Sequence, residues 1–177
     1  ELVCAVGSLK TYDIPSSVTS IGASAFWDCS SLTSINIPST QTSIGEKTFS
    51  GCSSLTSINI PSSVTSIELG AFAGCSSLTS INIPSSVTSI QWDAFYGCSG
   101  LTSINIPSSV TSIYPSAFAG CSSLTAFTVD ANNPNYCAEG LMLFNKEKTE
   151  LVSVFDNQKT YDIPSSVTSI GASAFWD

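Results

Sequence analysis

Cysteine is the residue type with the most chemistry to offer in this chain, because histidine and arginine are both absent. Seven cysteines are present, and most of them recur at one constant spacing. The recurring set is Cys29, Cys52, Cys75, Cys98 and Cys121, and the other two are Cys4 and Cys137. A zinc site needs clustered ligands such as a Cys-x-x-Cys pair, which the chain lacks. We therefore predict no metal site, and we interpret the recurring five as small buried side chains stacked inside the fold.

Disulfide formation is the other reaction open to these thiols. The spacing of stacked strands would allow bonds along the recurring set, but parallel side chains do not favour such bonds and five thiols cannot all pair. A bond between Cys4 and Cys137, or from either one to a neighbouring copy of the repeat block described below, stays open.

Carboxylates would have to carry any acid–base catalysis, and their placement does not suit it. Asp13, Asp28 and Asp93 fall in different parts of the chain, and none has a carboxylate partner at a repeated spacing. A glycine-rich phosphate loop and a Gly-x-Ser-x-Gly nucleophile motif are also absent. We predict that the protein is not an enzyme, has no catalytic residue and needs no cofactor.

The apolar residues recur at the same spacing as the cysteines, which is 23 residues. Repeats of this length are typical of solenoids. Isoleucine followed by proline recurs at Ile14, Ile37, Ile60, Ile83 and Ile106, with Val129 next in the series. The phenylalanine series is Phe26, Phe49, Phe72, Phe95 and Phe118, and the leucine series is Leu32, Leu55, Leu78, Leu101 and Leu124. A single repeat is too small to fold alone, so each must bury its apolar side against its neighbours.

One repeat of this array predicts one turn of a coil. Residues 79–83 alternate polar and apolar β-formers, which indicates a strand with Ile81 and Ile83 inward. Pro84 ends the strand because proline has no N–H for a ladder. Val87 and Ile90 then point inward from a second extended segment, and residues 94–98 are predicted to form a short helical turn that closes the coil.

The outward strand positions form two polar series. They are Asn36, Asn59, Asn82 and Asn105, and beside them Ser34, Ser57, Ser80 and Ser103. A functional interpretation makes them a polar surface for a glycan or an ice-like lattice. We favour a structural ladder in which asparagine side chains stack and hydrogen-bond to their neighbours.

The repeats differ mainly around the Ala-Phe pair, away from the predicted sheet. The aromatic residues at these variable positions are Trp27, Trp92, Tyr96 and Tyr114. They are the candidate partner-binding residues, because exposed Trp and Tyr dominate interface energetics. The alternative is surface drift, with aromatic rings that merely cover the edge of the coil.

The pattern Leu-x-x-Ile-x-Ile-Pro-x-x-Val-x-x-Ile-x-x-x-Ala-Phe-x-x-Cys resembles the 23-residue BspA-type, or treponemal-type, leucine-rich repeat. The resemblance implies a leucine-rich repeat solenoid with a parallel β-sheet on its concave side and short helical turns or 3-10 segments on the other side. It also implies a surface or secreted protein of a bacterium or a protozoan parasite, a group in which several members are adhesins. A shared repeat does not imply a shared ligand.

Three regions follow from the sequence. Residues 1–129 are the regular repeats, and residues 130–159 are an irregular insert in which two apolar runs around a charged 145–149 segment predict a β-hairpin. Residues 160–177 begin a second block, because residues 159–177 repeat residues 10–28 without a change at an offset of 149. We expect the chain to be a window cut from a longer precursor, since it has neither a signal peptide nor an initiating methionine.

Charge and hydropathy exclude several partners. The formal net charge is −8, with five basic residues against 13 acidic ones, so the chain lacks a basic surface for nucleic acid or anionic membranes. No apolar run is long enough to span a bilayer. These features agree with the extracellular or cell-surface location that the resemblance implies.

Two functions stay open. The first is an adhesion scaffold that presents a repetitive surface to a host or matrix protein, a glycan or another cell surface. The second is a structural filament in which blocks of about 149 residues stack end to end, so that the partner is a copy of the same protein. A small-ligand module is disfavoured because a filled solenoid core leaves no pocket.

Overall fold

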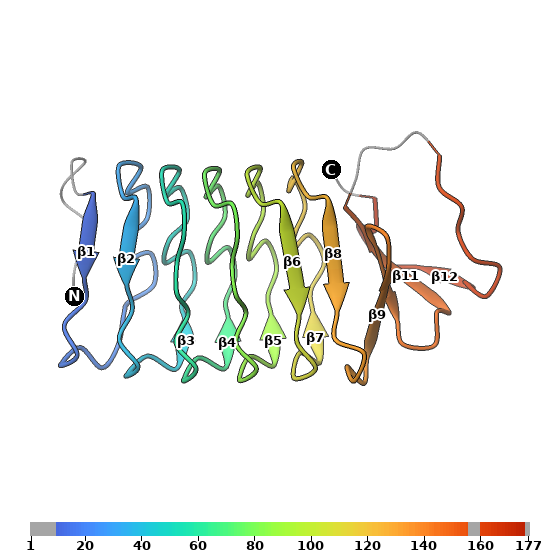
Figure 1. Ribbon diagram of the computed structural model, residues 1–177, viewed down its shortest axis with the longest axis horizontal. Helices are drawn as coiled ribbons and strands as arrows, with labels where there is room; N and C mark the ends of the chain where they lie inside the picture. The colour runs from blue at the N-terminus through green and yellow to red at the C-terminus, as the bar shows by residue number, and fades with distance from the viewer. Residues whose placement is uncertain (1–9, 156–159, 176–177) are drawn as a thin grey trace.

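The computed structural model describes residues 10–155 and 160–175. It shows a row of coils stacked along the long axis, one repeat per coil, followed by an antiparallel region at the C-terminal end (Figure 1). The twelve strands are short: β1 Thr11–Asp13, β2 Ser34–Asn36, β3 Ser43–Ile44, β4 Ser66–Ile67, β5 Ser89–Ile90, β6 Ser103–Ile106, β7 Ser112–Ile113, β8 Ala126–Val129, β9 Tyr136–Glu139, β10 Met142–Asn145, β11 Glu150–Val154 and β12 Ser169–Ile170.

The strands of the repeats are parallel and pair equivalent residues of neighbouring repeats. The sheet β3-β4-β5-β7 pairs Ser43 with Ser66 and continues in the same register to Ser112. The pairs β1-β2 and β6-β8 lie on another side of the coil and keep the same register. A constant repeat length places like residues next to each other, which is the arrangement that the sequence predicts for a solenoid.

The predicted strand over residues 79–83 is weaker than expected. It is reduced to isolated bridges, in which Ser80 pairs with Ser103 and Asn82 pairs with Asn59. Ile81 and Ile83 do point inward and are buried. The backbone bond from Thr79 N to Thr56 O is long, at 3.4 Å, so the ladder is stretched in the middle of the stack and is regular only near its ends.

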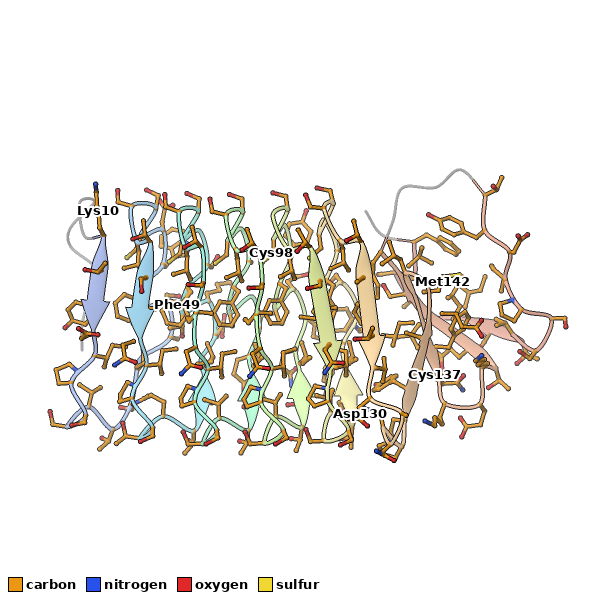
Figure 2. The ribbon with its side chains drawn as sticks, viewed as in Figure 1. Lys10, Phe49, Cys98, Asp130, Cys137 and Met142 are labelled. Carbon is orange, nitrogen blue, oxygen red and sulfur yellow. The ribbon has the colours of Figure 1, made fainter. Side chains whose placement is uncertain are left out.

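A column of phenylalanine rings runs through the core. Figure 2 shows Phe49, one of its members, inside the coil. Successive ring centroids from Phe26 to Phe118 are 5.4, 5.5, 5.4 and 5.2 Å apart, and neighbouring planes are within 17° of parallel. Each ring therefore covers the next, and a repeat in the middle of the stack is packed on both sides.

The segment around each Ala-Phe pair is a chain of tight turns, which we call the turn ladder, and the described residues contain no helix. Two positions in each repeat have positive φ, which interrupts a right-handed helix. The first series is Ser24, Lys47, Gly70, Asp93 and Ser116, and the second is Asp28, Gly51, Gly74, Gly97 and Gly120. Alternate N–H groups of the segment bond to the following repeat, as Phe72 N does to Ala94 O at 2.8 Å. The turn ladder thus replaces the predicted helical turn, because bonding between repeats uses the donors that a helix would need.

The insert contains the β-hairpin that the sequence predicts. Strand β10 pairs antiparallel with β11 and also with β9. Phe155, which follows β11, stacks on Phe127 with ring centroids 4.3 Å apart and meets Phe118 edge-on at 5.7 Å. The insert thereby covers the end of the phenylalanine column that would otherwise be exposed.

The duplicated sequence keeps two local contacts in both places, although Thr11–Asp13 forms strand β1 and residues 160–162 form no strand. Val18 N bonds to Pro15 O at 2.9 Å, and Val167 N bonds to Pro164 O at 3.0 Å. The ring pair Tyr12–Phe26 is tilted by 52°, and the pair Tyr161–Phe175 is tilted by 54°. The second copy joins the structure through β12, which pairs parallel with β11.

Candidate functional site

The recurring cysteines line the core beside the phenylalanine column. The Sγ of Cys52, Cys75 and Cys98 lies 3.1 to 3.2 Å from the phenylalanine carbonyl oxygen of the preceding repeat, to which it donates a hydrogen bond, and Cys121 does so at 3.4 Å. These four thiols are buried and free. Cys29 is buried too, but it is disulfide-bonded, so the prediction that all five recurring cysteines are alike was wrong for Cys29. The recurring cysteines thus add a weak hydrogen bond between neighbouring repeats.

Burial controls the reactivity of these thiols. It raises the pKa of Cys52 and of Cys121 to about 12, and it raises the pKa of Cys75 and Cys98 well above the usual range. A thiolate is the nucleophile, so such thiols are inert at neutral pH. Cys137 is a free, half-buried thiol, which excludes the bond from Cys137 to Cys4 that the sequence left open. Cys4 itself lies outside the described residues.

We predict that a thiol reagent labels Cys137 well before the buried four. Cys137 is the one free cysteine in the described part of the chain that reaches solvent, and burial raises its pKa only against the opposing effect of Lys148 and Lys146. Mass spectrometry after short exposure to iodoacetamide at mildly alkaline pH would measure the order. Labelling of Cys75 as fast as Cys137 in the native protein would contradict the burial of the column.

The asparagine series lies on the exposed side of the strands, but it does not form the expected chain of amide hydrogen bonds. Asn36, Asn59 and Asn82 are joined by backbone bridges, and within residues 10–155 and 160–175 no hydrogen bond links one asparagine side chain of the series to the next. Asn105 Oδ1 accepts a bond from Thr128 Oγ1 at 2.9 Å. Threonine hydroxyls supply the bonds between repeats instead, as Thr102 Oγ1 does to Thr79 O at 3.2 Å.

The turn ladder carries a cluster of exposed apolar side chains, which we call the aromatic edge. Its members are Leu69, Trp92, Tyr96 and Tyr114. Trp92 and Tyr114 come from adjacent repeats, and their ring centroids are 6.1 Å apart. Leu69 occupies the position equivalent to Trp92 in the preceding repeat, where Gly70 N bonds to Trp92 O at 2.9 Å. Trp92 and Tyr96 flank the buried Ala-Phe pair of one turn, so the scaffold holds both rings outward.

The structure does not bring Trp27 to this cluster. Trp27 is 62% exposed, and it occupies the position equivalent to Tyr96 but three repeats away. Three steps of about 4.8 Å separate the two backbones by roughly 14 Å. Of the four aromatic candidates, Trp92 and Tyr114 therefore form a pair, Tyr96 lies on the same turn as Trp92, and Trp27 stands apart.

The same edge carries the charges of the regular repeats. Between residues 14 and 129 the charged residues are Asp28, Glu46, Lys47, Glu68 and Asp93, and all of them lie within or directly before the turn segments. Lys47 contacts Glu46, with Nζ and Oε1 3.6 Å apart. The strand side of these repeats is uncharged. The aromatic edge is therefore bordered by carboxylates, and its nearest lysine already has an acidic neighbour.

Other kinds of site lack support in residues 10–155 and 160–175. No group of three or more His, Cys, Asp or Glu residues in that part of the chain is placed to hold a metal ion. The same residues contain no helix with the length and hydropathy to cross a bilayer.

The family follows from the repeat pattern. The model of the BspA type leucine-rich repeat region matches residues 4–130 in six copies. The chain belongs to the BspA-type leucine-rich repeat family. A search of the curated proteins finds no match. The residues of the aromatic edge lie at positions that differ from repeat to repeat on this BspA-type framework.

Solved structures agree with the family and with the parallel stack. A leucine-rich repeat protein from Bacteroides ovatus is 41% identical over 67% of this chain and 33% of its own, with a TM-score of 0.62. A leucine-rich cell surface protein from Faecalibacterium prausnitzii is 31% identical over 94% of this chain and 52% of its own, with a TM-score of 0.70. The pneumococcal vaccine antigen PcpA, at 21% identity over 97% of this chain and 53% of its own, has the same fold with a TM-score of 0.73. This BspA-type chain spans about half the length of these proteins or less.

Two buried amides were not identified from the sequence. Gln41 and Asn133 occupy the inward valine position, one repeat before Val64 and one repeat after Val110 respectively, and both are buried. Asn133 Nδ2 donates to Pro107 O and Val110 O, both at 2.9 Å. Its Oδ1 accepts from the N–H groups of Asn135 and Tyr136, also at 2.9 Å. The break in the valine series was the signal that could have located Asn133.

Proposed function

We propose that this protein is a non-catalytic binding scaffold of the cell surface or the secreted fraction, which uses the aromatic edge to adhere to a protein or glycan partner. The single observation that carries the proposal is the exposure of Trp92, Tyr96 and Tyr114 on a stack whose recurring apolar side chains are buried. Exposed aromatic rings on a rigid support lose little conformational entropy on binding. A solved relative described as a cell surface protein supports the location.

Rigidity is what makes this edge suited to recognition. The backbone on both sides of Trp92 is tied to neighbouring repeats, by Gln91 N to Ile67 O at 2.9 Å and by Gly70 N to Trp92 O at 2.9 Å. Phe95 of the same turn is anchored in the core. A partner therefore meets rings whose backbone is already ordered, which reduces the entropic cost of association.

We predict that Trp92→Ala weakens binding to the partner about tenfold or more, as loss of a central aromatic anchor does in other interfaces, while Trp27→Ala changes it by less than about twofold. Surface plasmon resonance against a panel of extracellular matrix proteins, together with a glycan array, would identify the ligand and measure both variants. Both substitutions remove an exposed tryptophan, so their effects on stability are matched. Equal effects on binding would argue against the aromatic edge.

A structural filament is the second candidate. The observation that favours it is that residues 160–175 repeat two local contacts of residues 11–26, namely the turn bond to the proline carbonyl and the tilted Tyr–Phe ring pair. On this hypothesis residues 1–129 are an array of repeats, residues 130–159 are a spacer and residues 160–177 begin the next block. Electron microscopy of native material would separate the two: regular fibres favour the filament, and single particles bound to a partner favour adhesion.

A further inference from the structure

The aromatic edge has an electrostatic character of its own. Glu68 directly precedes Leu69 and Asp93 directly follows Trp92, so a carboxylate adjoins each of two neighbouring apolar side chains. Ser66 Oγ donates to Glu68 Oε1 at 2.6 Å, and Ser116 Oγ donates to Asp93 Oδ1. These bonds fix the position of each carboxylate without neutralising it. Lys47 is the one cation between residues 14 and 129, and it lies beside Glu46.

We infer that the aromatic edge binds a basic, extended segment of a protein partner, with a guanidinium or ammonium group held against the Trp92 ring between Glu68 and Asp93. The inference rests on the proposed function of this edge and adds the chemistry of the partner. A cation is attracted to the face of an indole ring, and neighbouring carboxylates add a Coulombic contribution of the same sign. Loss of one of these carboxylates would weaken the attraction without removing the ring.

The shape of the edge favours a peptide segment over a small cation. Leu69, Trp92 and Tyr114 come from three successive repeats, and two steps of about 4.8 Å make the strip roughly 10 Å long. An extended chain covers that length with about three residues. Leu69 and Tyr114 would contact the apolar parts of the neighbouring side chains, which a lone cation could not use.

A single-tryptophan protein tests the inference directly. Trp27→Phe and Trp176→Phe leave Trp92 as the only indole, so its fluorescence reports on the edge. The probe is a short peptide of alternating arginine and serine, and its matched control carries citrulline in place of arginine, which keeps the shape and removes the charge. We expect the arginine peptide to change Trp92 emission and to bind about tenfold more tightly than the citrulline peptide at low salt.

Two charge variants complete the test. Glu68→Gln with Asp93→Asn keeps the size of both side chains, and asparagine tolerates the positive φ of residue 93. We expect this pair of substitutions to weaken binding of the arginine peptide about five- to tenfold. The control pair is Glu147→Gln with Asp162→Asn, which makes the same change in net charge at exposed residues of the insert and of the second copy. It should change binding by less than about twofold.

Three results would overturn the inference. They are equal binding of the arginine and citrulline peptides, equal effects of the two charge variants, and no change in Trp92 emission with the arginine peptide. Binding of a neutral glycan or peptide that depends on Trp92 but not on Glu68 or Asp93 would leave the proposed function standing and would refute the basic partner. If no protein, peptide or glycan bound in a way that depends on Trp92, both the proposed function and the basic partner would be refuted.

Discussion

Phe72→Ala is expected to lower the free energy of unfolding by about 3–5 kcal/mol, the range for truncation of a buried phenylalanine. Phe72 is fully buried and stacks between Phe49 and Phe95, with centroids 5.5 and 5.4 Å away. Its removal leaves a cavity with aromatic walls on both sides. The turn ladder, through Phe72 N and Ala94 O, keeps the backbone from collapsing into that cavity.

The effect should also change the cooperativity of unfolding. In a solenoid each repeat contacts only its neighbours, so stability is a sum of repeat terms and interface terms. Phe72 lies in the middle of the column, and its loss weakens the two interfaces that connect the repeats before and after it. We expect urea unfolding followed by circular dichroism to shift to lower concentration and to broaden, as the two halves begin to unfold separately.

Tyr96→Ala provides the matched control. It truncates an aromatic ring on the same turn ladder, but that ring is exposed and belongs to the aromatic edge. A surface substitution of this kind should change stability by no more than about 0.5 kcal/mol. If Phe72→Ala and Tyr96→Ala were equally destabilising, or if Phe72→Ala cost less than about 1 kcal/mol, the column would not be the source of stability that its packing indicates.

The phenylalanine column shows what the sequence could predict. The repeat length is constant, and each repeat carries the same apolar residues at the same positions. Stacking the repeats buries these apolar side chains, whereas few other arrangements would. The same spacing predicts the inward valine and isoleucine positions and the ladder of parallel strands. The solenoid fold and the positions of individual core residues therefore followed from periodicity, and the family followed from the resemblance of the repeat pattern.

The turn ladder shows where that reasoning stopped. The first left-handed position is occupied by serine, lysine, glycine or aspartate, as Ser24, Lys47, Gly70 and Asp93 show, so residue type gives no consistent signal. A helical turn was predicted because alanine and phenylalanine suit one. Hydrogen bonds to the next repeat compete for the same N–H groups, and that competition depends on the stack as a whole rather than on one repeat.

The aromatic edge was partly predictable. The exposure of Trp92, Tyr96 and Tyr114 followed from their variable positions, but which of them are neighbours depends on how the turns align between repeats. Leu69 was not predicted to join the cluster. Its place one full repeat before Trp92 was a sufficient signal, because equivalent positions in adjacent repeats lie side by side.

Asn133→Val is expected to destabilise the protein by about 3–5 kcal/mol, although valine is the residue that the regular repeats carry at this position. The Val110 carbonyl would lose the Asn133 amide, and the N–H groups of Asn135 and Tyr136 would lose its Oδ1, whereas the Pro107 carbonyl would keep its bond from Val110 N. Buried polar groups without partners cost about 1–3 kcal/mol each. In the preceding repeat the equivalent carbonyl, that of Val87, accepts a hydrogen bond from Ser109 Oγ at 2.7 Å.

Gln41→Val is the control that separates the loss of an amide from a change in the valine column. Gln41 is buried at the same position of an earlier repeat, and its Nε2 donates to Val18 O at 3.0 Å. That carbonyl also accepts a bond from Thr40 Oγ1 at 2.6 Å, so Gln41→Val leaves it paired. Urea unfolding should therefore show a change within about 1 kcal/mol for Gln41→Val, against the larger loss for Asn133→Val.

Amide hydrogen exchange at Tyr136 should accelerate only in the Asn133→Val variant, because the Tyr136 N–H bonds to Asn133 Oδ1. If both variants were neutral, Asn133 would be a tolerated interruption of the valine column. A loss confined to Asn133→Val would show that this amide ends the regular stack and joins it to the hairpin.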